Sequence, residues 1–344
     1  METPVLGRLQ RPLAVFFIAA TTCIPIWGKD AGCEVPTLVS TGGAFPRNSR
    51  TLAIRWTGYS NFELAYNGQV ILLDAYFDRG STFAPLGFKA ADVKKADLIL
   101  IGHGHFDHMS DAASVGARTG AVVVGSPLTV EKLRTQNIDA KQIRTVTGRG
   151  GEVLKFSRFE VEAILGRHGQ PPANVTNAFN QALRSATTPL TAEETAEGAQ
   201  IRSRGTSDPR ITEEGTITYL ITLDDGYRIM YRDSGGAITE FEKDVMKRIG
   251  RVDLALAAVA ANILPNLTAQ QSLDYLRTYK PDIFIPAHHD APRNGLWRST
   301  EPIFQALKDE NPNLITISKQ YREPICLETE NNIQRNAGRS KPKN

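Results

Sequence analysis

The chain has 344 residues, and 41% of them are apolar, which is enough for a folded core and excludes global disorder. Its 40 Lys and Arg residues nearly balance its 37 Asp and Glu residues, so the formal net charge is only +3 at pH 7. A nucleic-acid-binding domain would show a basic face or stripe, and we therefore expect no nucleic-acid partner.

The N-terminal residues have the pattern of a secretory signal peptide. Arg8 and Arg11 precede the apolar stretch 12–20, and a positive region followed by about 7–15 apolar residues is typical of such signals. The stretch is short for a membrane span, which needs about 20 residues. We expect residues 1–28 to be a signal peptide and the protein to be exported, either periplasmic or secreted. An uncleaved signal is the alternative, and it is the only feature that would attach the protein to a membrane.

Strands are predicted where apolar residues alternate or form short continuous runs bounded by turn residues. They fall at 52–56, 62–66, 70–74, 98–102, 121–125, 142–146, 159–165, 216–223, 227–231, 254–259, 283–286 and 314–318. The turn Asp224-Asp225-Gly226 predicts a hairpin, because Asp-Gly supplies the positive φ of a tight turn. Helices are predicted where apolar residues recur at helical spacing, mostly after a Ser or Thr that can cap the first turn. They fall at 126–136, 239–249, 268–279 and 300–309.

This order of elements predicts a layered α/β domain over residues 29–330, in which two sheets pack on each other. Residues 170–210 interrupt the pattern, because they are rich in Pro, Ala, Thr, Gly and Arg, with a short helix possible at 191–198. A long insertion in a compact domain is usually a functional lid or simply mobile. Residues 331–344 are polar and are expected to be a disordered tail.

Three of the six histidines lie within the segment His103-Gly104-His105-Phe106-Asp107-His108, directly after an apolar strand. In extended backbone, positions i and i+2 project to the same side, so His103 and His105 can bind one metal ion together. Asp107 and His108 follow on the turning loop and can face a neighbouring site. Imidazole nitrogens and carboxylate oxygens are ligands that suit zinc. The alternative is a polar loop with solvated histidines, which would be favoured for a lone His but not for this cluster.

The motif His-x-His-x-Asp-His after a hydrophobic strand resembles the signature of the metallo-β-lactamase superfamily. The superfamily's other landmarks follow in order: Asp74 at the end of an early strand, His168 in Gly-Arg-His-Gly, Asp233 in Asp-Ser-Gly, and His288 two residues after Pro286. The resemblance spans roughly residues 52–289. It implies an αββα four-layer sandwich, an α/β fold in which two mixed β-sheets pack face to face.

The resemblance also implies a site for two Zn²⁺ ions, with Mn²⁺ or Fe²⁺ as other divalent candidates. The implied metal ligands are His103, His105 and His168 for one ion, Asp107, His108 and His288 for the second, and Asp233 as the bridge between them. Asp74 would orient the metal-binding loops instead of binding metal. Two metal ions about 3.5–4 Å apart can share a hydroxide whose pKa is pulled toward neutrality.

Simpler explanations stay open for several of these residues. His168 could be a surface histidine, and Asp233 could be the Asp of a turn. His288 and His289 compete for the last ligand position. The resemblance favours His288, which leaves His289 as a group that supports the ligands or faces the substrate.

The stretch Trp56-Thr57-Gly58-Tyr59-Ser60-Asn61-Phe62 is similar to Trp-x-Gly-His-Ser-x-Phe in the branch that contains ascorbate-6-phosphate lactonase. N-acyl-phosphatidylethanolamine phospholipase D resembles the same branch. Tyr59 stands where that branch usually has His. Its hydroxyl could donate a hydrogen bond in the site, or its ring could simply pack on the sheet.

Together with these residues, the resemblance implies a zinc-dependent hydrolase in which a metal-bridging hydroxide cleaves an ester, lactone or phosphodiester bond. The substrate would be a small molecule or derived from a lipid, and the candidate catalytic residues are Asp107, His108, Asp233, His289 and Tyr59. The alternatives are a non-hydrolytic metal-binding protein of the same fold, either a redox di-iron protein or a binding module with a degraded site. The oligomeric state is not indicated.

Two cysteines remain after the predicted signal peptide, near opposite ends of the mature chain. Cys33 and Cys326 could pair in an oxidising compartment. Two unpaired thiols are equally compatible with the sequence, because it does not supply their separation. No cysteine lies near the histidine motif, which excludes a thiolate metal site.

Overall fold

The computed structural model describes residues 32–170, 174, 177, 189–259, 265–290 and 299–329. The predicted signal peptide 1–28 and the predicted tail 331–344 lie outside the described residues. The predicted insertion 170–210 is described mainly from residue 189 onward. Within the described part of the chain, no helix has the length and apolar character needed to cross a membrane.

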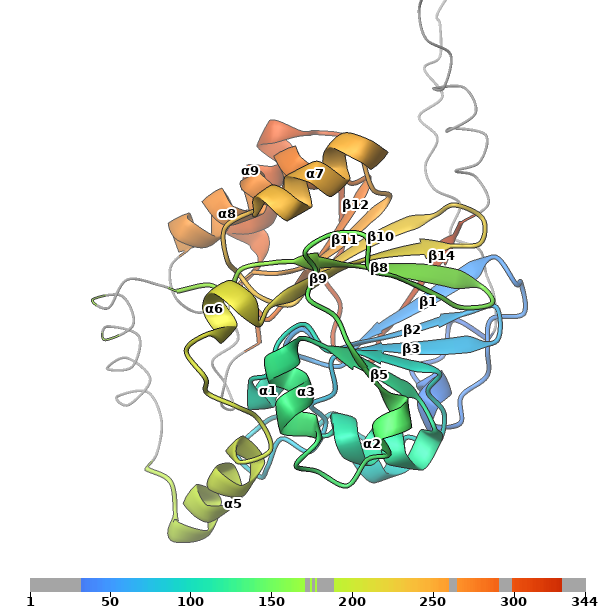
Figure 1. Cartoon of the computed structure of the whole chain (residues 1–344). Coiled ribbons are helices and arrows are strands. Elements are labelled where there is room, and N and C mark those ends of the chain that lie inside the picture. Colours follow the sequence, from blue (N-terminus) through green and yellow to red (C-terminus); the bar gives the residue numbers. More distant parts are fainter. Residues whose placement is uncertain are drawn as a thin grey trace, which may run out of the picture.

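Two seven-stranded sheets form the centre of the described structure (Figure 1). Their strand orders are β14-β1-β2-β3-β4-β5-β6 and β13-β12-β11-β10-β9-β8-β7. The strands of the first sheet are β1 (Thr51–Trp56), β2 (Phe62–Tyr66), β3 (Gln69–Leu73), β4 (Leu98–Leu100), β5 (Val122–Gly125), β6 (Ile143–Thr145) and β14 (Pro324–Glu328). Those of the second are β7 (Val153–Lys155), β8 (Phe159–Leu165), β9 (Ile217–Leu223), β10 (Arg228–Arg232), β11 (Leu254–Ala258), β12 (Ile283–Ala287) and β13 (Ile315–Thr316).

Both sheets are mixed. In the first sheet, β14, β1, β2 and β3 pair antiparallel, whereas β3, β4, β5 and β6 pair parallel. In the second sheet, β7 to β10 pair antiparallel, and β10 to β13 pair parallel. Parallel neighbours need long crossovers, which here contain the helices.

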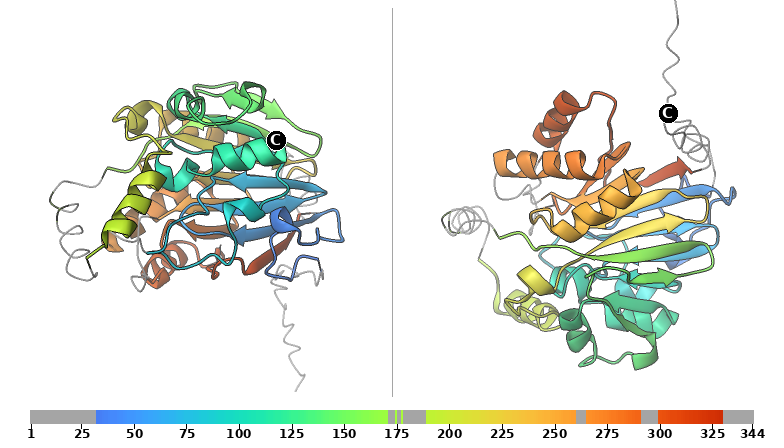
Figure 2. Two further views of the ribbon diagram at one scale, coloured as in Figure 1. Left: turned by 90° about the horizontal axis from the view of Figure 1, so that it is seen from below. Right: turned by 45° about the horizontal axis from the view of Figure 1, so that its top comes forward.

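Helices cover the outer face of each sheet (Figures 1 and 2). The helices on the side of the first sheet are α1 (Phe106–Met109), α2 (Ala112–Thr119) and α3 (Pro127–Leu133). Those on the second sheet are α7 (Glu240–Ile249), α8 (Pro265–Tyr279) and α9 (Glu301–Glu310). The remaining α-helices are α5 (Ala192–Arg202) and α6 (Ile211–Glu214), and short 3-10 helices lie at Val39–Thr41, Ala90–Asp92 and Ala140–Gln142. The predicted αββα four-layer sandwich is therefore confirmed.

The period-two pattern of the strands builds the layers. Leu52, Ile54 and Trp56 of β1 lie in the core between the two sheets. Ala53, which points the opposite way, lies in the core between the first sheet and its helices. Because successive side chains of a strand point to opposite faces, one strand contributes to two cores. A third core lies between the second sheet and helices α7, α8 and α9.

All predicted strands are present, with ends that shift by at most two residues, and the four predicted helices are present as well. Thr239 caps α7 with its side chain and shares a capping box with Glu242, as its position before the helix predicts. The strands β7 and β14 and the helices α1, α2 and α6 were not predicted, because they are short and lack a periodic apolar pattern. At an edge position beside β1, β14 can begin with Pro324, since an edge strand tolerates the missing N–H.

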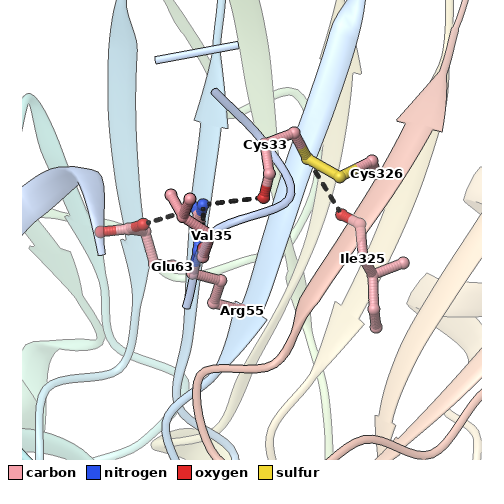
Figure 3. The surroundings of a disulfide bond; sticks show 6 residues. All are labelled: Cys33, Val35, Arg55, Glu63, Ile325 and Cys326. Carbon is pink, nitrogen blue, oxygen red and sulfur yellow. Dashed lines mark hydrogen bonds and ion pairs between the residues drawn. A yellow bond between two sulfur atoms is a disulfide. The ribbon is translucent and has the colours of Figure 1, made fainter. Parts of the chain in front are cut away.

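A disulfide joins Cys33, in the segment before β1, to Cys326 in β14, with the two Cα atoms 6.0 Å apart (Figure 3). The pairing that the sequence left open is thus formed. Beside it, the buried Arg55 guanidinium lies 3.3 Å from Glu63 and donates to the carbonyl of Cys33 at 3.1 Å. Glu63 in turn accepts from the backbone N–H of Val39 and Ser40. Covalent and polar contacts together hold the first described segment to the sheet.

Candidate metal centre

The candidate ligands lie on loops that follow strand ends on one edge of the sandwich. Strands β8, β10 and β12 run in the same direction, because β8 and β10 are both antiparallel to β9 and β10 to β12 pair parallel. Their carboxyl ends therefore meet at one edge and carry His168, Asp233 and His288. The segment His103–His108 follows β4 of the other sheet and reaches the same place. The sheet topology thus brings together four segments that are far apart in sequence.

The metal-binding side chains predicted from the sequence form three overlapping groups. In each group, the candidate ligand atoms lie within 4.8 Å of one another. The groups are His103, His105 and His168; His103, His108 and Asp233; and Asp107, His108 and His288. The structure therefore brings all seven predicted positions together, with Asp233 between the two triads that the resemblance implies.

Individual distances show how tightly these atoms converge. His103 Nε2 lies 2.9 Å from His105 Nδ1, and His103 Nδ1 lies 2.6 Å from Asp233 Oδ2. On the other side, Asp107 Oδ2 lies 3.3 Å from His288 Nε2 and 3.6 Å from His108 Nε2. Nitrogen and oxygen atoms gathered at this spacing resemble the ligand set of a divalent metal site.

Asp74 holds the candidate metal-binding loops in place. Its buried carboxylate accepts from the backbone N–H of Gly102 at 2.9 Å and from the Tyr231 hydroxyl at 2.6 Å. Its Oδ2 also lies 2.6 Å from His108 Nδ1. A carboxylate bound to one ring nitrogen of a histidine fixes the ring and directs the other nitrogen outward. The placement matches the orienting role that the sequence suggested for Asp74.

Three non-glycine residues beside this cluster have left-handed backbone. The φ angles are +59° at Asp74, +58° at His288 and +47° at Tyr59. Such conformations cost free energy and persist only where the surrounding contacts impose them. Here the backbone N–H of His288 donates to the carbonyl of Tyr59 at 2.7 Å. Two of the three strained positions, Tyr59 and His288, are therefore joined by a backbone hydrogen bond.

The electrostatics of the cluster favour a bound cation. Burial and neighbouring imidazoles hold the pKa of His103 well below its ordinary value, and burial lowers the pKa of His105 and brings that of His168 to about 4. Neutral imidazole is the form that binds metal. Burial acts to lower the pKa of His108, but Asp107 and the other carboxylates around it raise that pKa to about 10. The carboxylates therefore attract positive charge to this part of the site.

Asp233 shows how well the residues fit a metal ion. Its Oδ1 is buried and has no hydrogen-bond partner within the described part of the chain. A buried carboxylate oxygen without a partner is costly, and a metal ion would satisfy it. Gly102 makes this arrangement possible, because a Cβ atom there would come within 2.0 Å of the Asp233 carboxyl carbon.

A cavity of about 880 Å³ opens above the cluster. Besides the metal-binding side chains, its wall includes Arg167, Thr206, Gln271 and Tyr275, together with Arg202 from α5. The predicted insertion 170–210 therefore contributes to the cavity wall. The described residues of this segment include the arginines at 202, 204 and 210, and of these only Arg202 lines the cavity. Arg204 lies 3.5 Å from Asp111, Arg210 lies 2.6 Å from Asp208, and Arg184 lies outside the described residues.

Tyr59 and His289, both predicted as catalytic, do not line this cavity. The Tyr59 ring packs edge-on against His288, with ring centroids 4.9 Å apart. His289 is buried and stacks on Trp56 at a centroid distance of 4.3 Å. Tyr59 thus packs against the candidate ligand His288. The position of His289, buried against Trp56 and outside the cavity wall, does not support direct contact between His289 and a substrate.

The sequence alone did not identify the buried network that holds the Tyr59 loop. Asp290 accepts from the backbone N–H of Tyr59 at 2.9 Å, from Arg79 at 3.2 Å and from the Tyr321 hydroxyl at 2.7 Å. The position of Asp290, directly after His288 and His289, was the only local signal. Its partners come from distant segments, so their roles become visible only in the folded chain.

Comparison with known proteins finds several relatives that are named metal-dependent hydrolases. A UPF0173 metal-dependent hydrolase of Polynucleobacter asymbioticus is 22% identical, over 77% of this chain and 83% of the relative. Another, from Nitratidesulfovibrio vulgaris, is 26% identical over 60% of this chain and 67% of the relative. The similarity to one from Methanopyrus kandleri reaches 36%, but it covers only 22% of this chain and 30% of that relative.

Solved structures share the fold at low sequence identity. Igni18, a metallo hydrolase from Ignicoccus hospitalis, superposes with a TM-score of 0.56 at 14% identity, covering 81% of this chain and 99% of Igni18. An isothiocyanate hydrolase from Delia radicum gut bacteria gives a TM-score of 0.52 at 12% identity, covering 80% and 99% of the two chains. Residues 53–288 also match the family described as beta-lactamase superfamily domain. The chain therefore belongs to the metallo-β-lactamase superfamily.

Proposed function

We propose that this protein is a hydrolase that uses two zinc ions. The observation that carries the proposal is the set of three overlapping His and Asp groups that line one cavity. The first and second groups share His103, and the second and third share His108. Curated relatives with the name metal-dependent hydrolase support the same chemistry.

In the proposed site, each triad would hold one ion. The first ion would be held by His103, His105 and His168, the second by Asp107, His108 and His288, and Asp233 would lie between them. When bound, two such ions supply an activated water near neutral pH and polarise the bond to be cleaved. The contribution of the chain is to keep the ligands in place: Asp74 orients His108, and the backbone contact to Tyr59 orients the His288 loop.

The proposed substrate carries an ester, lactone or phosphodiester bond and is a small molecule or derived from a lipid. A cavity of about 880 Å³ falls within the usual range of small-molecule sites, roughly 300–1,000 Å³. The stretch Trp56–Phe62 supports the branch of ascorbate-6-phosphate lactonase, apart from Tyr59. Arg202 in the cavity wall would suit a substrate with an anionic group.

Metal removal tests the proposal directly. We expect protein loaded with zinc to contain two ions per chain and to turn over at least one member of a lactone, phosphodiester, β-lactam and acyl-amide panel. Chelation should abolish that turnover and added zinc should restore it, because the activated water depends on the ions. Hydrolysis that survives complete chelation, measured beside metal content by elemental analysis, would contradict the proposal. Iron with a visible absorption band would favour the redox alternative, and absence of bound metal would favour a binding module.

Export is a further part of the proposed function. The disulfide between Cys33 and Cys326 supports it, because such bonds form and persist in oxidising compartments. We expect protein expressed from the full chain in a bacterial host to accumulate outside the cytoplasm and to lack roughly the first two dozen residues or slightly more. N-terminal sequencing of the purified protein measures this, and a mature chain that still begins at Met1 would contradict cleavage.

A further inference from the structure

Arg232 lies fully buried at the end of β10, directly before Asp233. Its guanidinium donates to the carbonyl oxygens of Ser234 at 3.1 Å, Gly236 at 2.6 Å and Ala237 at 2.9 Å. These carbonyls belong to the loop that follows Asp233. A planar guanidinium with five N–H donors can satisfy several carbonyls at once.

The same guanidinium reaches the loop that carries His168. Arg232 Nη2 donates to the carbonyl of Arg167 at 3.4 Å. The two loops also touch directly, because the backbone N–H of Gly169 donates to Ser234 Oγ at 3.1 Å. A Cβ atom at Gly236 would come within 1.9 Å of the Arg167 carbonyl oxygen. The loops of His168 and Asp233 are therefore in backbone contact, with Arg232 bound to both.

Arg232 is also bound by residues of α7 and α8, two of the helices that cover the second sheet. Its Nε donates to the buried carboxylate of Glu242 at 3.0 Å, and its Nη1 donates to the Tyr275 hydroxyl at 2.5 Å. Glu242 also accepts from the Tyr279 hydroxyl and from the backbone N–H of Thr239 at 2.7 Å, at the start of α7. The guanidinium thus has one fixed position, set by α7 and α8.

We propose that Arg232 is a positioning residue that sets the place of His168 relative to Asp233 by binding the backbone of both loops. The inference rests on the proposed function, because it assigns these two side chains to the metal site. Arg232 does not itself line the cavity, so its influence passes through the loops. Lysine would keep the charge, but its one ammonium group has three donors where arginine has five on three nitrogens, so it cannot replace the hydrogen bonds to both loops and to Glu242 together.

The variant Arg232→Lys tests this role, with zinc affinity as the readout that does not depend on catalysis. We expect zinc affinity, measured by competition with a chromophoric chelator, to fall about 10–100-fold for at least one of the two ions, the loss typical when a group that orients metal ligands is removed. Glu242→Gln keeps an oxygen acceptor but removes the charge that holds Arg232. We expect it to fold and to show a smaller loss in the same direction.

A matched control is a second fully buried Arg–Glu pair in the described part of the chain, Arg55 with Glu63. Arg55 also donates to backbone carbonyls, those of Cys33 and Val35, but it contacts neither the His168 loop nor the Asp233 loop. Arg55→Lys should therefore lower the unfolding temperature as Arg232→Lys does, while zinc affinity stays at the wild-type value. An equal loss of affinity in both variants would reduce Arg232 to a general stabilising role and overturn the proposal.

Two results separate this inference from the proposed function. If the wild-type protein binds no zinc, the proposed function fails. If the wild type binds two zinc ions and both Arg232→Lys and Glu242→Gln bind them with unchanged affinity, the positioning role fails. Crystals of Arg232→Lys give a second readout, because the segment 167–169 should move relative to Asp233 with or without zinc. An unmoved segment would also overturn the proposal. Should Arg232→Lys not fold, Glu242→Gln carries the same two measurements.

Discussion

The variants His105→Ala and Asp107→Ala are expected to lower kcat by at least about 10²–10³-fold, the loss typical when one group that stabilises transition-state charge is removed. Each residue belongs to one candidate triad, His105 with His103 and His168, and Asp107 with His108 and His288. Both side chains are only partly buried, so alanine leaves the hydrophobic cores intact. The loss should therefore come from the metal site and not from unfolding.

Three measurements on the same preparations check this result: turnover of an identified substrate, zinc content per chain, and thermal unfolding followed by circular dichroism. Asp139→Ala is a suitable control, because Asp139 is an exposed carboxylate outside the cavity that caps a short 3-10 helix. It should keep wild-type turnover and zinc content. Wild-type turnover in His105→Ala or Asp107→Ala would remove that residue from the mechanism.

Loss of the disulfide is expected to have the largest effect on stability. Cys326→Ser should lower the free energy of unfolding by about 2–5 kcal/mol, the range for removal of a native disulfide. The sequence separation of 293 residues makes the cross-link effective, because closing a long loop removes much conformational entropy from the unfolded chain. The candidate metal ligands lie on other segments, so kcat measured well below the unfolding transition should stay near that of the wild type.

Urea unfolding of wild type and Cys326→Ser, each with and without a reducing agent, measures this effect. Reduction should destabilise the wild type by a similar amount and leave Cys326→Ser unchanged, since the variant has no disulfide to lose. Cys33→Ser should match Cys326→Ser, because each removes the same bond. Equal stability of wild type and both variants under oxidising conditions would contradict the prediction.

The amino-acid sequence by itself determined the fold class and most of the strands. The strands Phe62–Tyr66 and Phe159–Leu165 have the bounds that their apolar patterns predict, because alternation decides at once which residues are extended and which face is buried. The candidate ligands in the segment His103–His108 could also be predicted from the sequence, since they are neighbours in the chain and need only a local turn to converge.

Only the tertiary structure decided which distant residues meet that segment, and at what distance. His168, Asp233 and His288 were placed in order by resemblance, but their convergence depends on the strand directions of the second sheet. The pairing of Cys33 with Cys326 likewise depends on β14 lying beside β1. Strand pairing is non-local, and a short strand such as β14 acquires its structure from its partner more than from its own pattern.

Buried polar contacts were the least predictable feature. Arg232 follows an apolar strand and was not singled out, although it binds the backbone of two loops and a buried carboxylate. A buried arginine must find acceptors for its donors, but the sequence does not say where these acceptors lie. They come from α7, α8 and two loops, and only folding brings them within hydrogen-bond distance.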